Sequence, residues 1–259
     1  MTAAGDYRAF LEAKRPAARR LGFAIDPDEV NPILKAHQRD MVVWGVGGGR
    51  RAYFARFGLG KTVVQIETLR LVLARAGGRG LVVAPLGVRA EFMRDAAMLG
   101  VPIRFVRRIE EAADEGLHVT NYETIRDGKL DPAHFTAVSL DEAAVLRGFG
   151  GSKTFREFMR VLAGEDGATG AGGPGVPYRF VATACPSPNE FIELLAYAAF
   201  LGVMGVGEAK TRFFKRDSQH ADRLTIHPHK EAEFWLWVST WSLWLQRPSD
   251  ICGGDCHAA

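Results

Sequence analysis

Short apolar runs alternate with amphipathic stretches through most of the chain. Such runs, separated by segments with helical spacing, are typical of buried parallel strands joined by crossover helices. The runs that fit this description are Ala52–Ala55, Leu81–Ala84, Ile103–Val106, Leu117–Thr120, Ala137–Leu140 and Phe180–Thr183. The pattern therefore predicts an α/β fold of three layers, with helices on both faces of a mostly parallel sheet.

A helix is predicted to begin at Asn31, since Pro32 suits a first helical turn. The glycine-rich run Gly45–Gly49 is expected to end it. Apolar and aromatic residues recur at helical spacing between these limits: Leu34, His37, Met41 and Trp44.

The pattern divides the chain into three expected parts. Residues 1–30 form an N-terminal helical extension, with helical spacing over Asp6–Lys14, and residues 31–200 form the sheet-containing lobe. Residues 201–259 form a helical, aromatic-rich extension with a flexible tail. Inside the lobe, glycine dominates Gly164–Pro174, which we expect to be a mobile surface loop.

Aromatic side chains recur at helical spacing near the C-terminus, at Phe234, Trp237, Trp241 and Trp244. This stripe favours a helix that buries its aromatic face against its own sheet or against another lobe. A platform on which nucleic-acid bases stack is the alternative.

Composition narrows the class of protein. With 259 residues, 47% hydrophobic and 24% charged, the chain is expected to fold as one large domain or a domain with an appendage. A formal charge of +3 permits a basic patch but does not require a nucleic-acid partner. No apolar run is long enough for a membrane span, and no signal peptide is expected.

The cysteines, Cys185, Cys252 and Cys256, are too few and too unevenly spaced for a disulfide framework, which indicates a reducing compartment, the cytoplasm. With His257, the last two provide only three candidate zinc ligands in a glycine-rich tail. A structural zinc site takes four ligands, so we expect none here.

A phosphate-binding loop is predicted where the strand ending at Ala55 runs into a helix that starts near Lys61. Glycines let successive backbone N–H groups face phosphates, and the helix N-terminus favours an anion. Lys61 would reach the β- and γ-phosphates of ATP, and the Thr62 hydroxyl would hold Mg²⁺. Ala55 replaces the usual first glycine of this motif. The residues expected to bind ATP here are Gly58, Leu59, Gly60, Lys61 and Thr62.

Two carboxylates, Asp141 and Glu142, follow the apolar strand Ala137–Leu140. The C-terminal end of a parallel strand is where such sheets bind ligands. Asp141 would ligate Mg²⁺, and Glu142 would orient and deprotonate the attacking water. Taken alone, such a pair is more often a helix cap, and the phosphate loop is what favours a catalytic role.

In this order the motifs resemble the first RecA-like lobe of superfamily 2 helicases, most closely the Snf-type translocase-related proteins of phages and prophages. The resemblance covers roughly residues 22 to 250 and implies ATP and Mg²⁺ as cofactors, and DNA, in duplex form, as a partner. It also implies that Gln38, in His37-Gln38-Arg39-Asp40, reads the edge of the adenine. Phe23, upstream of this motif, either stacks on the base or is an ordinary core residue.

Two segments resemble the family motifs that contact DNA phosphates. Leu81–Val88 resembles motif Ia and places Pro85 at the end of a strand. Val119–Glu123 resembles motif Ib and supplies Thr120 and Asn121. Without the resemblance, each would be an ordinary strand end.

A further segment, Phe180–Asn189, resembles motif III, which couples the ATP site to DNA. Thr183 matches the family, whereas Cys185 replaces the second threonine of that motif, which puts coupling rather than ATP binding in question. Ser152 and Lys153 either contact a phosphate or begin a solvated helix, with Ser152 as its N-cap.

Superfamily 2 ATPases bind ATP between two RecA-like lobes, and the second lobe supplies arginines to the transferring phosphoryl group. The sequence ends at Ala259, so a second lobe is expected to come from another chain or to have been lost by truncation. The leading hypothesis is the ATP-binding lobe of a DNA-dependent ATPase, a translocase or helicase, that is slow or inactive alone. The alternatives are a nucleotide-responsive DNA-binding module without turnover and a lobe of a restriction-enzyme motor subunit.

Overall fold

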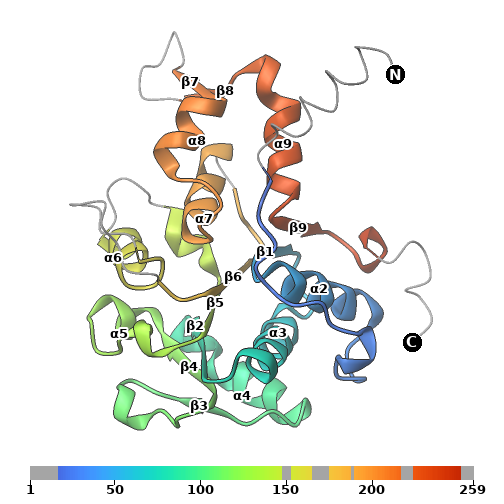
Figure 1. The fold of residues 1–259 in the computed structure, drawn as a ribbon, viewed down its shortest axis with the longest axis vertical. Helices are drawn as coiled ribbons and strands as arrows, with labels where there is room; N and C mark the ends of the chain where they lie inside the picture. Colours follow the sequence, from blue (N-terminus) through green and yellow to red (C-terminus); the bar gives the residue numbers. More distant parts are fainter. Residues whose placement is uncertain (1–16, 148–152, 165–174, 188–189, 217–223, 252–259) are drawn as a thin grey trace.

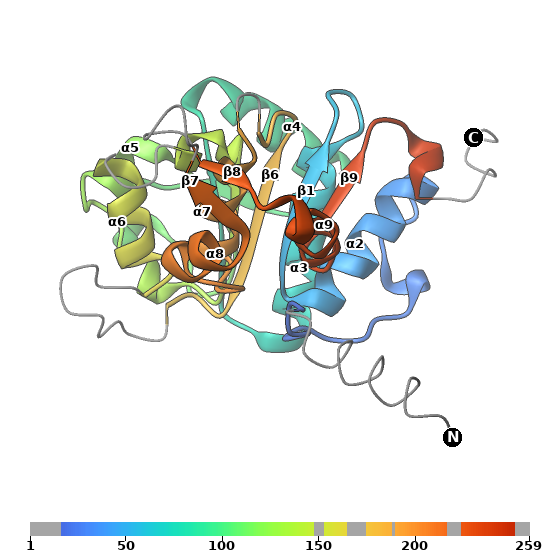
Figure 2. The same ribbon diagram turned by 90° about the horizontal axis from the view of Figure 1, so that it is seen from above.

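The computed structural model describes residues 17–147, 153–164, 175–187, 190–216 and 224–251. Their main feature is a seven-stranded sheet with helices on both faces (Figures 1 and 2). Its order is β3-β4-β2-β5-β6-β1-β9, and every neighbouring pair is parallel. The strands are β1 (Arg50–Ala55), β2 (Arg79–Ala84), β3 (Ile103–Phe105), β4 (Gly116–Asn121), β5 (Ala137–Asp141), β6 (Tyr178–Thr183) and β9 (Ser242–Leu245).

Helices cover the sheet on both sides, which confirms the predicted three-layer α/β fold. One face carries α2 (Ala36–Gly48), α3 (Lys61–Ala76) and α4 (Arg89–Met98). The other carries α5 (Tyr122–Arg126), α6 (Lys153–Val161), α7 (Leu194–Phe200), α8 (Val206–Phe213) and α9 (Glu231–Ser239). An antiparallel hairpin of β7 (Phe214–Arg216) and β8 (Leu224–Ile226) lies beyond α8 (Figure 1).

Burial on both faces explains why the strands are continuous apolar runs. In β1, Tyr53 and Ala55 belong to the core beneath α2 and α3, while Ala52 and Phe54 belong to the core on the opposite face. All four are at most 2% exposed. No alternation of polar and apolar residues is therefore expected, and the six strands predicted from apolar runs are confirmed.

Helix α2 begins at Ala36 and not at Asn31, which corrects the predicted helix start. The side-chain Oδ1 of Asn31 accepts a hydrogen bond of 3.1 Å from the backbone N–H of Ile33, and this closes a local turn ahead of the helix. Lys35 then has extended backbone as the N-cap residue. The asparagine therefore forms a turn of its own instead of the first helical turn.

The glycine run ends α2 as predicted, but only at its last residues, because Gly45 and Gly48 still lie within the helix. Both glycines pack against β1: a Cβ on Gly45 would collide with the Tyr53 hydroxyl, and one on Gly48 with the Arg51 guanidinium. The last helical residue is Gly48, and the C-cap residue Gly49 has a left-handed φ of 71°. The absence of side chains at these two glycines thus allows α2 to pack closely against β1.

The aromatic stripe is split between a helix and a strand. Helix α9 ends at Ser239, and Ser242–Leu245 forms β9, which pairs with β1, so a continuous helix here was a wrong prediction. Phe234, Trp237 and Trp241 are at most 1% exposed, which excludes them from a base-stacking surface and confirms burial against the chain's own core. The sheet therefore uses residues on both sides of the predicted boundary at residue 201.

Several sequence-based predictions lie outside the described residues. They concern the helix over Asp6–Lys14, the N-cap Ser152 and the tail with Cys252, Cys256 and His257. The glycine-rich loop falls there too, over residues 165–174. Within the described ranges, no helix is long and apolar enough to cross a membrane.

The close contact of α2 with β1 predicts that Gly45→Ala lowers the free energy of unfolding by about 1–3 kcal/mol, because the new methyl overpacks against Tyr53. Gly47→Ala is the control, since the nearest atom to its Cβ, the Phe23 carbonyl oxygen, lies at 3.8 Å. That variant should gain up to about 1 kcal/mol from helix propensity. Urea unfolding measures both, and equal stability of the two variants would contradict this packing.

Candidate nucleotide site

The residues singled out by sequence gather at one edge of the sheet, where the parallel strands end. The phosphate loop follows β1, Asp141 ends β5, and Thr183 ends β6, which lies between those two strands. Phe54 of β1 is in register with Thr183, and Asp141 with Ala182. Three segments far apart in sequence are thereby brought to adjacent positions.

The loop between β1 and α3 has the backbone geometry of an anion-binding turn. Gly58 and Gly60 have φ of 84° and 78°, which is left-handed backbone that favours glycine. A Cβ on Gly60 would also collide with the Gln38 amide, so this glycine keeps the loop against α2. Ala55 still belongs to β1 and pairs with Leu245, so the absent first glycine of the motif is not needed for a turn there.

Lys61 and Thr62 open helix α3 beneath this loop. The Lys61 ammonium donates a hydrogen bond of 3.1 Å to the Ala55 carbonyl oxygen and lies 4.8 Å from the centre of the exposed Phe57 ring. The Thr62 hydroxyl is buried and lies 3.3 Å from Oε1 of Glu91 in α4. The loop therefore brings together an ammonium, a hydroxyl and the first N–H groups of a helix, the donors that bind phosphates.

Asp141 is buried, and its Oδ1 accepts a hydrogen bond of 2.8 Å from the Gln65 side chain. The same amide accepts a 2.7 Å bond from the Ser139 hydroxyl. Burial raises the pKa of Asp141 to about 6; the Gln65 bond and the charge of Lys61 oppose the rise, and Glu142 adds to it. A cation beside such a buried carboxyl group would favour its ionised form and lower its pKa.

Glu142 has a left-handed φ of 48° and is linked to the neighbouring strand. The Thr183 hydroxyl donates a 3.2 Å hydrogen bond to Glu142 Oε2 and accepts one of 3.2 Å from the backbone N–H of Cys185. Cys185 itself is exposed. The replacement of threonine by cysteine thus leaves the link between Thr183 and Glu142 intact, since Cys185 takes part through its backbone.

Gln38 contacts the phosphate loop itself. Its Oε1 accepts a 3.0 Å hydrogen bond from the Lys35 backbone N–H, and its Nε2 donates one of 3.4 Å to the Leu59 carbonyl oxygen. Nε2 of the buried His37 lies 3.3 Å from the same oxygen, and burial lowers the pKa of this histidine. Helix α2 therefore holds the loop from the side on which the predicted adenine contact lies.

Phe23 lies at the other end of the strands and not near the loop. Its ring is 5.4 Å from that of Tyr178, the first residue of β6, and its backbone N–H donates to the Val46 carbonyl oxygen. The ring packs against the core beneath α2. Of the two interpretations, the core residue is correct, and the base-stacking one is wrong.

The residues expected to touch DNA lie at the ends of β2 and β4, on the same edge of the sheet as the loop. Pro85 leads into a short turn in which Leu86 is 51% exposed. Thr120 is 1% exposed, and the Asn121 side chain caps α5 by accepting a 3.1 Å hydrogen bond from the Thr124 N–H. At this position the exposed turn can reach a ligand directly, while the Asn121 side chain holds the start of α5 and the buried Thr120 hydroxyl has no hydrogen-bond partner among the described residues.

The donor set suits Mg²⁺ bound together with phosphates. Thr62 and Asp141 offer the hydroxyl and carboxylate oxygens that this ion prefers, and it usually takes its remaining ligands from phosphate and water. No group of three or more acidic, histidine or cysteine side chains in the described part of the chain forms a metal cage of its own. Lys153, the other suggested phosphate contact, begins α6.

Sequence reasoning missed three residues around Asp141. Gln65 lies one helical turn after Lys61 and is fully buried, and the hydroxyl of the buried Tyr122 donates to the Asp141 backbone carbonyl oxygen. Glu91 comes from α4. A polar residue at a buried helical position was the only signal for Gln65 in the sequence.

The raised pKa of Asp141 predicts a pH dependence of stability. An unfolded aspartate titrates near pH 3.9, so between about pH 4 and 6 the folded chain binds the extra proton, and the contribution of Asp141 falls as pH rises. Without Mg²⁺, Asp141→Asn should match the wild type at pH 4 and exceed it by about 1–3 kcal/mol above pH 6. Denaturant unfolding at each pH measures this, and a difference between the two proteins that does not grow between pH 4 and pH 6 would contradict it.

Comparisons with known proteins identify the fold and not a sequence family. No protein-family model matches the sequence, and neither does any curated protein. The SWI2/SNF2 ATPase core of Sulfolobus solfataricus in complex with double-stranded DNA matches at a TM-score of 0.64 and 17% identity, over 85% of this chain and 46% of that one.

Two further structures support this result. A second structure of the Sulfolobus solfataricus core domain has a TM-score of 0.61 and 17% identity, over 88% of this chain and 47% of that one. UvsW of bacteriophage T4 has a TM-score of 0.52 and 14% identity, over 78% of this chain and 43% of that one. The chain thus spans less than half the length of these proteins. It has a RecA-like α/β fold, which it shares with these structures.

Proposed function

We propose that the chain is the ATP-binding lobe of a DNA-dependent ATPase of the helicase type, a translocase on duplex DNA that works with a second RecA-like lobe. The observation that carries the proposal is the convergence of three segments on adjacent strands β1, β6 and β5. They supply the phosphate loop with Lys61, the hydroxyl of Thr183, and the carboxylates of Asp141 and Glu142. ATP binding requires the phosphate loop and the two carboxylates, and coupling to DNA requires the Thr183 hydroxyl.

The phosphate end of ATP would lie against the start of α3. Backbone N–H groups of Gly58 and Gly60 would face the phosphates, and that of Leu59 would first have to leave the Arg56 carbonyl oxygen. Lys61 would exchange its bond to the Ala55 carbonyl oxygen for the phosphates. Thr62 and Asp141 hold Mg²⁺, which neutralises charge on the phosphates when bound. The cation also offsets the cost of ionising the buried Asp141.

Glu142 would accept a proton from the attacking water. Its carboxylate is oriented by the Thr183 hydroxyl at 3.2 Å, and its backbone is held in the left-handed region. A non-glycine residue in this conformation costs of order 1–3 kcal/mol, which is typical of functional sites. The strain and the hydrogen bond together restrict the direction in which the base points.

DNA is proposed to contact the same edge of the sheet, after β2 and β4. The exposed turn that follows Pro85 is the direct contact, Asn121 positions the backbone beside it, and Thr120 lies buried at the end of β4. The Sulfolobus solfataricus core of the same fold was solved with double-stranded DNA. Gln38, already against the loop, would read the adenine once it leaves the Leu59 carbonyl oxygen.

The affinity for Mg·ATP tests whether the loop between β1 and α3 binds phosphates. Lys61→Ala should reduce the affinity measured by calorimetry at least tenfold, because an ion pair with two phosphates is lost. Lys129→Ala is the matched control, since that lysine is exposed and pairs with Asp127. Equal affinity in the wild type and Lys61→Ala would refute the assignment of the loop.

A measurement of ATP hydrolysis distinguishes the proposed ATPase from a regulatory module that binds ATP without hydrolysing it. The chain alone should hydrolyse ATP near background, since an arginine supplied by a second lobe is worth about 10³–10⁵ in rate. With a second lobe in trans, duplex DNA should stimulate turnover, and Glu142→Gln should abolish it while leaving ATP affinity within about twofold. Binding without turnover in every combination would favour the regulatory module.

The link between Thr183 and Glu142 predicts a separation of binding from stimulation. Thr183→Val keeps the shape but removes the hydroxyl that bridges Glu142 and the Cys185 N–H. ATP affinity should stay within about twofold, while the DNA-stimulated rate falls about tenfold, the size of one hydrogen bond to a charged group. Thr183→Ser should restore the rate, and an unchanged rate in Thr183→Val would show that the bond plays no part in coupling.

A further inference from the structure

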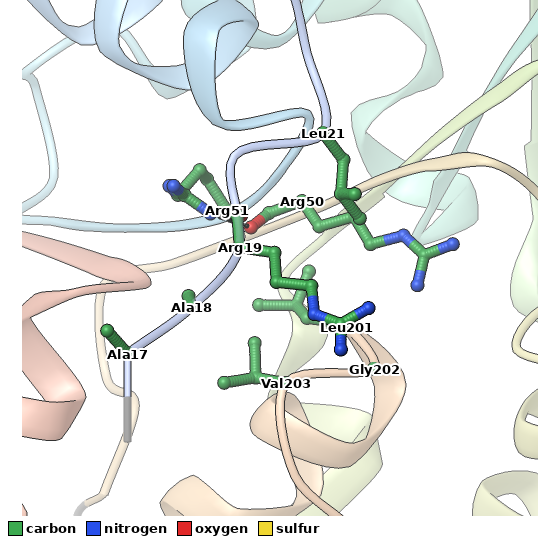
Figure 3. A pocket seen from close by; sticks show the side chains of 9 residues that line it. All are labelled: Ala17, Ala18, Arg19, Leu21, Arg50, Arg51, Leu201, Gly202 and Val203. Carbon is green, nitrogen blue, oxygen red and sulfur yellow. Dashed lines mark hydrogen bonds between the residues drawn. The ribbon is translucent and has the colours of Figure 1, made fainter. Parts of the chain in front are cut away.

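The edge of the sheet opposite the nucleotide site carries a cluster of arginines. Arg50 and Arg51 begin β1, and Arg19 lies on the segment that crosses beside them. They line a cavity of about 550 Å³ whose other wall is the loop Leu201–Val203 (Figure 3). The six residues of β1 place this cavity about 17 Å from the phosphate loop, at about 3.3 Å per residue.

Arg19 and Arg50 point to the same side of the cavity, over Gly202, whereas Arg51 points away from them (Figure 3). Gly202 makes room for two guanidinium groups. A Cβ at this position would lie 2.7 Å from Nη1 of Arg50 and 2.8 Å from Nη2 of Arg179. Its φ of 68° also favours glycine, and the missing side chain lets the guanidinium groups approach the backbone of this loop.

No carboxylate balances Arg50 or Arg51 among the described residues. Arg50 donates one hydrogen bond of 2.9 Å, from Nε to the Pro177 carbonyl oxygen, and Arg51 donates only to the backbone carbonyl oxygens of Arg50 and Arg19. Burial lowers the pKa of both guanidinium groups, and Arg20 lowers that of Arg51 further. Arg51 is 4% exposed, and its Nε has no hydrogen-bond partner in the part of the chain that the structure describes.

Buried cations without a counter-ion are costly, and proteins normally pair them. Here the protein supplies only carbonyl oxygens and an aromatic face, that of Trp44, at 5.4 Å from the Arg51 guanidinium. The two terminal nitrogens of Arg50 and the whole guanidinium of the exposed Arg19 make no hydrogen bond within the described part of the chain. Each guanidinium is planar and offers several N–H donors, which match an oxyanion with several acceptor atoms.

We propose that this cavity is a second anion site, which binds a phosphate group between Arg19 and Arg50. Arg51, whose side chain points away from these two, adds positive charge near the site. The phosphate belongs to a free phosphomonoester or to a nucleic-acid backbone, since both present the same oxygens. The site is separate from the nucleotide site and does not depend on the proposed ATPase function.

Titration with inorganic phosphate tests the site, with chloride at equal ionic strength as the reference. The measurements use Lys61→Ala, so that the phosphate loop contributes nothing. Phosphate should bind in calorimetry and raise the melting temperature. Adding Arg19→Gln should weaken phosphate binding about tenfold or more, and so should Arg50→Gln, because each removes a charged donor. Arg94→Gln, at a side chain that is 72% exposed, is the control and should change nothing.

Arg19 is exposed, and its side chain makes no hydrogen bond to the described residues, so Arg19→Gln is expected to fold and provides the test if Arg50→Gln does not. Absence of phosphate binding in Lys61→Ala, or equal affinity with and without Arg19→Gln, would overturn the proposal. A short duplex that displaces phosphate and loses affinity in Arg19→Gln identifies a nucleic-acid source. Displacement by glucose 6-phosphate, with no effect of the duplex, identifies a free phosphomonoester.

Discussion

Strand β6 is hydrogen-bonded on one side to β1 and on the other to β5, and the candidate site depends on this double pairing. Its register aligns Thr183 with Phe54 at the end of β1, and Ala182 with Asp141 at the end of β5. A slip of one residue would turn every side chain of β6 to the opposite face. Because both faces are covered by helices, such a slip would break both cores, and burial therefore holds the site in place.

Charge is distributed unevenly between the two edges of the sheet. The C-terminal edge gathers the carboxylates of Glu91, Asp141 and Glu142 around one ammonium, that of Lys61, and the pKa of Asp141 rises as a result of burial and the neighbouring acids. The N-terminal edge gathers guanidinium groups whose pKa values fall on burial. Carboxylates thus outnumber the ammonium around Asp141 at one edge, whereas guanidinium groups without a carboxylate partner among the described residues gather at the other.

The six parallel strands and the order of the motifs could be predicted from the sequence, for a physical reason. A strand buried on both faces is a continuous apolar run, and that signal lies within a few residues. The phosphate loop is also local, because Gly58 and Gly60 adopt left-handed backbone within one turn, directly before the helix at Lys61. The Asp141-Glu142 pair follows its strand directly, so its place at the sheet edge was also predictable.

What the sequence did not reveal depends on residues far apart in the chain. Ser242–Leu245 became a strand because the edge of β1 was open to it, although the aromatic spacing alone favours a helix. The glycines of α2 have their role only because Tyr53 and Arg51 occupy the space beside them. Gln65 supports Asp141 across 76 residues, and Arg19 meets Arg50 through a crossing segment. Local pattern determined the strands and the loop, whereas tertiary packing decided which side chains surround them, since such contacts exist only once distant segments are buried together.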